Sequence, residues 1–230
     1  NDNSGRFLAA YSVKLDASGA LESYRRLGED DEPEAGAGKF YAYLIVAEPH
    51  PWFNDQTYVD TLNPKAIEKF VDVTYEAYFK AVGGEFDRTV PAIFTDEPHR
   101  GGLFTSHESK TDGVTSGIHH IPWTPKLPKE YKKAYGEDLT AELPKIFLRE
   151  NGERVNDAKW QYCDLVQTLF LKNFAQPQYD WCTKHNMIYT GHVLHENSFS
   201  NQVTMQGSLM RFYEYQHNPG VDMLTEHDNS

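Results

Sequence analysis

The sequence has few cysteines, and their placement argues against a disulfide. Cys163 and Cys182 both fall in a segment with helical periodicity. A continuous helix would hold the two sulfurs roughly 28 Å apart, far beyond the reach of a disulfide bond. We therefore expect buried, reduced thiols. Neither cysteine belongs to a spacing that would hold zinc.

Basic residues are also scarce. Lysine and arginine number 22 against 34 acidic residues, which gives a net charge of −12. Nucleic acid and anionic membrane surfaces both require a basic face, so we exclude them as partners. No apolar run approaches the ~18 residues of a membrane span. The first residues, "NDNSG", lack the basic and apolar regions of a signal peptide, so the signal of a secreted parent would lie outside this numbering.

Aromatic residues, in contrast, are plentiful at 13% of the chain. Aromatic rings stack on the apolar faces of sugars, although they fill protein cores as well. Trp52 and Trp123 fall in segments that we predict to be loops. We therefore predict that these two rings contact substrate, with packing that anchors the loops as the alternative.

The N-terminal part of the chain has the pattern of a β-hairpin. Residues 7–13 and 21–26 are predicted strands on either side of the turn "DASG". The acidic, glycine-rich stretch that follows is typical of a solvated loop. We divide the chain accordingly into a hairpin with an acidic loop, residues 1–38, and a larger domain, residues 39–230.

The larger domain alternates between predicted strands and predicted helices. Asn63 and Pro64 begin one helix, and a long helical run is expected to be kinked near Pro177. Such β–α–β units place strands in parallel with right-handed crossovers. The predicted parallel strands are residues 40–47, 89–95, 187–193 and 220–225. Because a complete barrel takes about 250 residues, we predict an α/β fold that is part of a (β/α)8 TIM-type barrel.

One predicted strand runs directly into acidic residues. In "AIFTDEP" (92–98), an apolar run ends at Asp96 and Glu97, and Pro98 cannot continue a strand. Active sites of α/β barrels are built at this end of the strands. Glu97 is therefore a candidate catalytic residue, and Asp96 a candidate contact to a sugar hydroxyl.

A second strand ends in the same way. In "TGHVLHENSFSNQ" (190–202), the apolar segment is followed by His192, His195, Glu196 and Asn197. Two carboxyls at one rim suit glycoside hydrolysis, in which one donates a proton and the other acts as base or nucleophile. We predict Glu97 and Glu196 for these roles and the three other polar residues for substrate contact. The alternative is structural hydrogen bonding, and the two histidines lack the third ligand and the HExxH spacing of a zinc site.

Three stretches resemble glycoside hydrolase family 106, the α-L-rhamnosidases. These stretches are "YVDTLNPKAIEKFVDVTYEAYFKAVGGEFDRTVPAIFTDEP", "TGHVLHEN" and "RFYEYQHNPGVDML". The resemblance implies inverting hydrolysis of terminal α-L-rhamnosides in plant or microbial polysaccharides, with Glu97 as general acid and Glu196 as general base.

The same resemblance implies features beyond these stretches. A calcium ion near the sugar is expected, with ligands that cannot be mapped onto this chain, and no organic cofactor. Family members are longer and carry β-rich accessory domains, so we expect the remainder of a longer parent chain, secreted or periplasmic.

Two other functions stay open. A non-catalytic carbohydrate-binding or scaffold barrel would suit the aromatic loops equally well. A retaining glycosidase of the large barrel clan has an Asn-Glu-Pro motif that "DEP" partly imitates, but Asp96 stands where that motif has asparagine.

Overall fold

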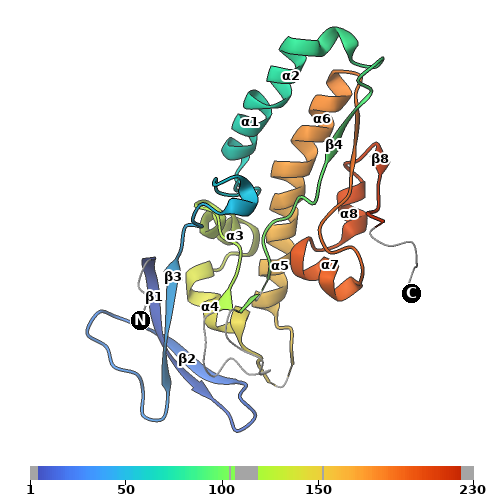
Figure 1. The fold of residues 1–230 in the computed structure, drawn as a ribbon. Coiled ribbons are helices and arrows are strands. Elements are labelled where there is room, and N and C mark those ends of the chain that lie inside the picture. The colour runs from blue at the N-terminus through green and yellow to red at the C-terminus, as the bar shows by residue number, and fades with distance from the viewer. Residues whose placement is uncertain (1–4, 104, 107–118, 152, 224–230) are drawn as a thin grey trace. The chain divides into compact units, whose positions relative to one another are not determined.

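A computed structural model describes residues 5–103, 105–106, 119–151 and 153–223 (Figure 1). The chain forms two compact units. The first unit comprises Asn1–Tyr58 and Phe104–Leu165, and the second comprises Val59–Leu103 and Val166–Ser230. Each unit has its own sheet and its own helices.

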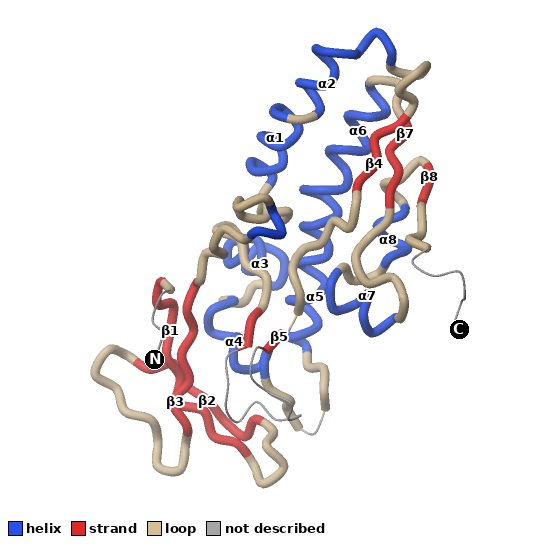
Figure 2. The backbone as a smooth tube through the Cα atoms, in the orientation of Figure 1, coloured by secondary structure: helices blue, strands red, loops and turns tan. Residues whose placement is uncertain are grey.

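The sheet of the first unit is antiparallel, with β1 (Arg6–Leu15) between β2 (Leu21–Leu27) and β3 (Gly38–Leu44) (Figure 2). The turn between β1 and β2 is held by Asp16, whose Oδ1 accepts hydrogen bonds from the backbone N–H groups of Ser18 and Ala20. Such side-chain-to-backbone bonds make Asp a favoured turn residue. The predicted N-terminal hairpin is confirmed.

Helices pack against this sheet. α4 (Leu139–Phe147) contacts both β1 and β2, and α3 (Leu127–Tyr135) packs on α4. The buried side chains of α3 and α4 are Leu127, Tyr131, Leu139, Leu143, Pro144 and Ile146. The remaining described elements of this unit are η1 (Pro51–Phe53), β5 (Thr105–Ser106), β6 (His119–His120) and the start of α5 (Asp157–Phe170).

The second unit begins with the predicted helix, which is interrupted once. Asn63 caps α1 (Pro64–Val73) by accepting a hydrogen bond from the backbone N–H of Lys65, and Pro64 occupies the first turn, as predicted. Thr74 separates α1 from α2 (Tyr75–Val82), and its hydroxyl donates to the carbonyl of Phe70. Such back-bonding by a threonine hydroxyl bends helices.

The sheet of the second unit is parallel. β4 (Ala92–Thr95) pairs with β7 (Ile188–Gly191), which pairs with β8 (Asn218–Pro219) (Figure 2). α1, α2 and α6 (Gln176–Lys184) belong to the same unit, and α6 contacts both α1 and β7. The core beside this sheet contains Tyr75, Phe86, Trp181, Cys182, Met187 and Tyr189.

The long helical run is interrupted where the sequence predicts. A π-helical segment, Leu171–Ala175, joins α5 to α6, with Pro177 in the first turn of α6. Proline lacks the N–H for an intrahelical bond and clashes with the preceding turn, so a wider turn accommodates it. α7 (Phe199–Met205) and α8 (Leu209–Tyr213) complete the unit. Within the described residues, no helix is long and apolar enough to cross a membrane.

The predicted partial (β/α)8 barrel is wrong. Among the strands that the structure describes, only β4, β7 and β8 pair with one another in parallel, and they form an open three-stranded sheet. The sheet has free edges at β4 and β8, whereas a barrel of this type closes eight strands on one another. The fold is instead mixed α/β, with one antiparallel and one parallel three-stranded sheet.

Two of the four predicted barrel strands account for this error. The strand predicted at 40–47 is β3, which pairs antiparallel with β1. No helix lies between β2 and β3, although a parallel barrel strand requires such a crossover. The strand predicted at 220–225 lies partly outside the described residues, and β8 precedes it at Asn218–Pro219. Phe94, which belongs to the apolar run of "AIFTDEP", is 61% exposed on the edge strand β4.

Candidate functional site

The candidate site lies in the second unit, where β4 and β7 end. Thr95 pairs with Gly191 at the last position of both strands, and the backbone N–H of His192 donates to the carbonyl of Thr95 at 3.3 Å. Gly191 has φ +137°, and a Cβ at this position would lie 2.0 Å from the Thr95 carbonyl oxygen. Only glycine permits this close approach, which brings Asp96 and Glu97 next to His192.

Asp96 contacts His192 directly. The Oδ1 atom of Asp96 lies 3.0 Å from Nε2 of His192. His192 is buried, with 8% of its surface exposed, whereas Asp96 is exposed. The ring of Phe94 packs edge-on against the imidazole at 5.6 Å between centroids. The carboxylate and the phenyl ring together fix the orientation of this imidazole.

Glu97, His192 and Asp222 converge on one point. One ring nitrogen of His192 and one carboxylate oxygen of each acid lie within 4.8 Å of one another. Glu97 has φ +43°, an uncommon conformation for a residue with a side chain. Because strained backbone conformations concentrate at functional sites, this conformation supports a functional role for Glu97.

Glu196 lies beside this cluster and is held by two backbone amides. Its Oε1 accepts from the N–H of Val193 at 3.0 Å, and its Oε2 accepts from the N–H of Asp222 at 2.9 Å. Burial, followed by the nearby charge of Glu196, raises the pKa of Tyr213. Both predicted catalytic glutamates therefore adjoin Asp222, Glu97 through its side chain and Glu196 through its backbone.

The other predicted site residues lie in the turn after β7 and in the first unit. His195 is exposed with φ +61°. Asn197 is also exposed, and its Oδ1 accepts from Nδ2 of Asn201 at 3.0 Å. Trp52 and Trp123 belong to the first unit, where Trp52 is 82% exposed in η1. Their predicted stacking on sugar stays a prediction.

Two residues of this region were missed by the sequence reasoning. Asp222 is the only charged residue in "GVDMLT", a signal that could have identified it. His99, which follows Pro98, has its pKa lowered by burial and by the positive charges of His195 and Arg100. A histidine that stays neutral can accept a hydrogen bond, and its Nδ1 accepts from the backbone N–H of Gly101.

The calcium ion implied by the family resemblance does not suit the converging cluster. Calcium takes six to eight oxygen ligands and no nitrogen. Glu97, His192 and Asp222 offer one imidazole nitrogen with two carboxylates. Imidazole suits zinc, copper, iron and nickel instead. We therefore do not assign calcium to this cluster.

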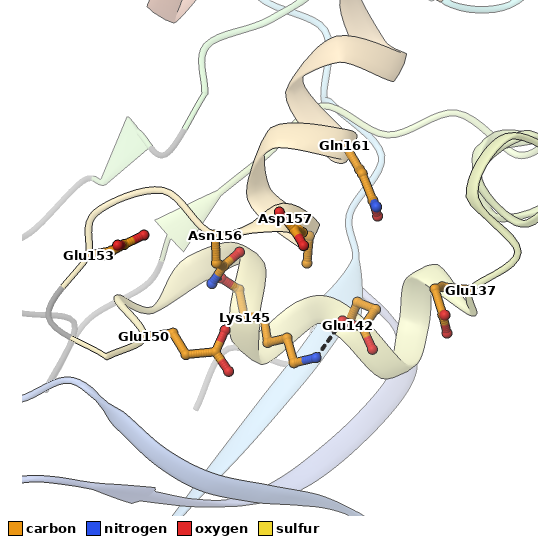
Figure 3. Close-up of a pocket in the computed structure, with 9 residues that line it drawn as sticks. Glu137, Glu142, Lys145, Glu150, Glu153, Asn156, Asp157 and Gln161 are labelled. Atoms are coloured by element: carbon orange, nitrogen blue, oxygen red, sulfur yellow. Dashed lines mark hydrogen bonds and ion pairs between the residues drawn. The ribbon is translucent and has the colours of Figure 1, made fainter.

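A separate acidic pocket lies in the first unit (Figure 3). It has a volume of about 440 Å³. Its charged lining consists of Glu137, Glu142, Lys145, Glu150, Glu153 and Asp157. Lys145 pairs with Glu142 at 3.1 Å. Among the described residues, no three of these carboxylates converge as the cluster in the second unit does.

Comparison with known proteins adds no relative. The chain matches no family model, and no curated protein or solved structure is significantly similar to it. Membership of glycoside hydrolase family 106 therefore stays a proposal that rests on the three stretches of sequence.

Proposed function

We propose that the second unit carries the site of a glycoside hydrolase that inverts the configuration of the sugar. One observation supports this most strongly: Glu97 and Glu196 follow neighbouring parallel strands, β4 and β7, and both adjoin Asp222. Inverting enzymes need two carboxyl groups on opposite sides of the scissile bond, about 6.5–9.5 Å apart, so that a water molecule fits between one of them and the sugar.

Glu97 is the proposed general acid. It is half-buried, and it lies close to the carboxylate of Asp222. In this role, its carboxyl would donate a proton to the glycosidic oxygen as the bond breaks. Asp96 and His192, which contact each other next to Glu97, are the proposed contacts to the sugar hydroxyls.

Glu196 is the proposed general base. Each of its oxygens accepts one backbone hydrogen bond, and a carboxylate oxygen has a second lone pair for another donor. A water molecule could therefore donate to Glu196 while both backbone contacts persist. The amides would then hold the carboxylate in position as it removes the proton.

The identity of the sugar rests on the family resemblance alone. We infer terminal α-L-rhamnosides as the substrate class, because the stretches that contain Glu97 and Glu196 are the ones that resemble α-L-rhamnosidases. Calcium could serve such a substrate only at a place other than the cluster of Glu97, His192 and Asp222.

The test is hydrolysis of an α-L-rhamnosyl disaccharide, whose leaving oxygen needs a proton, by the 230-residue chain and by three variants. We expect Glu97→Gln and Glu196→Gln to lose activity by about 10²–10⁴-fold, the usual size of general acid–base effects. Glu214→Gln, which changes an exposed glutamate at the end of α8, is the control and should keep full activity. NMR of the first-formed sugar should show the inverted anomer.

Three results would overturn the proposal. Net retention of configuration would indicate a retaining glycosidase. Equal rates for wild type and both active-site variants would exclude these two glutamates. Rhamnoside binding without hydrolysis by the wild-type chain would favour a non-catalytic carbohydrate-binding function.

A further inference from the structure

We propose that Glu97, His192 and Asp222 form a binding site for a divalent transition-metal ion of the zinc class. The inference rests on the geometry of these three side chains and does not require that the site hydrolyse a glycoside. All three residues belong to the second unit and lie where β4, β7 and β8 end.

His192 has the environment of a histidine that binds a metal ion. Its Nε2 lies 3.0 Å from the carboxylate of Asp96. Its Nδ1 is buried and has no hydrogen-bond partner among the described residues. Histidines that bind metals usually donate one ring N–H to a carboxylate and bind the ion through the other nitrogen. A buried imidazole nitrogen without a partner is otherwise rare, because buried polar atoms are almost always hydrogen-bonded.

The two carboxylates complete a set of three protein ligands. One oxygen of each acid and one ring nitrogen of His192 lie within 4.8 Å of one another. Around a tetrahedral zinc ion with bonds of about 2.0–2.2 Å, ligand atoms are roughly 3.3 Å apart. Small rotations of the two acidic side chains would shorten the distances between the ligand atoms to this value. The fourth position of the ion would be open to water, as in sites with three protein ligands.

The surrounding backbone supports this arrangement. Glu196 holds the backbone of Asp222 at 2.9 Å, and the close contact between Gly191 and Thr95 places His192 beside Glu97. The backbone beside all three ligands is thus held by contacts that need no ion. One imidazole with two carboxylates favours zinc, copper, iron or nickel over calcium and magnesium, which prefer oxygen ligands.

Metal binding would have a consequence for the proposed hydrolase. Glu97 as a metal ligand must be a carboxylate, so it could not donate a proton while the ion is bound. Binding of the ion and hydrolysis would then exclude each other. Zinc would inhibit the glycosidase, and a chelator would restore it.

The decisive experiment uses cobalt(II) as a spectroscopic probe and needs no substrate. We expect titration of the 230-residue chain with Co²⁺ to produce the visible absorption bands of a cobalt ion with a low coordination number. The absorbance of these bands should saturate at one equivalent of Co²⁺. Zn²⁺ should displace the cobalt and abolish the bands. Ca²⁺ in 100-fold excess should leave them unchanged.

Four variants test the assignment of ligands. His192→Gln and Asp222→Asn should each weaken cobalt binding by at least about tenfold. Asp96→Asn removes the carboxylate that orients the His192 imidazole, and it should weaken cobalt binding by about 10–100-fold. His195→Asn is the matched control: it removes an exposed histidine three residues away, and asparagine tolerates the positive φ of this position. It should bind cobalt as the wild type does. Circular dichroism and thermal unfolding show that each variant is folded.

The inference is overturned if Asp222→Asn binds cobalt as tightly as the wild type while folded, or if His195→Asn weakens binding as much as His192→Gln. Displacement of cobalt by calcium would overturn the choice of metal. A chain that binds cobalt at this site but does not hydrolyse rhamnosides would support the metal site and refute the proposed function. The two proposals therefore fail separately.

Discussion

Oε2 of Glu196 accepts a hydrogen bond of 2.9 Å from the backbone N–H of Asp222, so this one carboxylate connects the turn after β7 to the chain after β8. Its other oxygen accepts from Val193 in the same turn. Glu196 therefore has a structural role whether or not it is a catalytic base. A loss of activity on its substitution must be separated from a loss of stability.

Glu196→Gln is expected to destabilise the second unit. A glutamine amide has one oxygen and one NH₂ group, so it can accept from only one of the two backbone N–H groups that Glu196 satisfies. The other backbone N–H would then face the glutamine NH₂ group, which is also a donor. This unsatisfied N–H should lower the free energy of unfolding by about 1–3 kcal/mol. Urea unfolding at pH 7 measures this loss.

Glu214→Gln provides the control for this measurement. Glu214 is exposed, and its substitution should change the unfolding free energy by less than about 0.5 kcal/mol. If Glu196→Gln is as stable as Glu214→Gln, the two backbone contacts contribute nothing to stability.

Gly191→Ala should be strongly destabilising. A Cβ at Gly191 would lie 2.0 Å from the Thr95 carbonyl oxygen, and the residue has φ +137°. Both the clash and the backbone strain oppose a side chain, so we expect a loss of about 2–4 kcal/mol in unfolding free energy. The same variant should separate His192 from Glu97 and weaken cobalt binding.

Gly84→Ala is the matched control. A Cβ at Gly84 would meet no atom within 4 Å. We expect this variant to unfold at the wild-type denaturant concentration. Equal stability of the two alanine variants would show that the close approach of β4 and β7 at Gly191 is wrong.

The sequence predicted the local elements well and their pairing poorly. The hairpin, the capped helix at Asn63, the interruption near Pro177 and the parallel pair β4–β7 all follow from local signals: turn residues, N-caps, proline and apolar runs. The antiparallel pairing of β3 with β1 does not follow from such local signals, because the continuous apolar run "YLIVAE" obscured the alternation in "KFYAY". Pairing between strands depends on contacts between distant residues, which a periodic pattern does not specify.

The candidate site was predicted in part for the same reason. Asp96, Glu97, His192 and Glu196 follow strands that were recognised, so the rule that polar residues at strand ends meet at one edge applied to them. Asp222 follows the two-residue strand β8, which is too short to give an apolar run. Its position depends on the backbone contact with Glu196, a contact between residues far apart in sequence.

Alkaline pH is expected to destabilise the second unit. Burial raises the pKa of the Cys182 thiol from 9.0 to about 12, and burial also raises the pKa of Tyr75 in the same core. The unfolded chain loses the thiol proton near pH 9, while the folded chain keeps it until about pH 12. The stabilising contribution is therefore full below pH 9 and is lost as the pH rises to 12.

Unfolding free energies between pH 7 and 11 measure this effect. Each group adds a slope of about 1.4 kcal/mol per pH unit where only the unfolded state is ionised. Cys182→Ala should make the decline above pH 9 shallower, because it removes the thiol whose pKa burial raises. A wild-type stability that is constant from pH 8 to 11 would contradict the burial of both groups.

The proposed roles of Glu97 and Glu196 predict different responses to the leaving group. An activated aryl oxygen needs little protonation to depart, whereas the hydroxyl of a natural disaccharide needs a proton from the general acid. Glu97→Gln should therefore reduce kcat/KM much more for a rhamnosyl disaccharide than for a nitrophenyl rhamnoside. Glu196→Gln should reduce both to a similar degree, because water must be activated in either case.

Since Glu196→Gln is also expected to lower stability, its rates are measured at a temperature where circular dichroism shows the variant to be folded. If Glu97→Gln slows both substrates equally, Glu97 does not protonate the leaving oxygen. If Glu196→Gln slows only the disaccharide, the two roles are reversed.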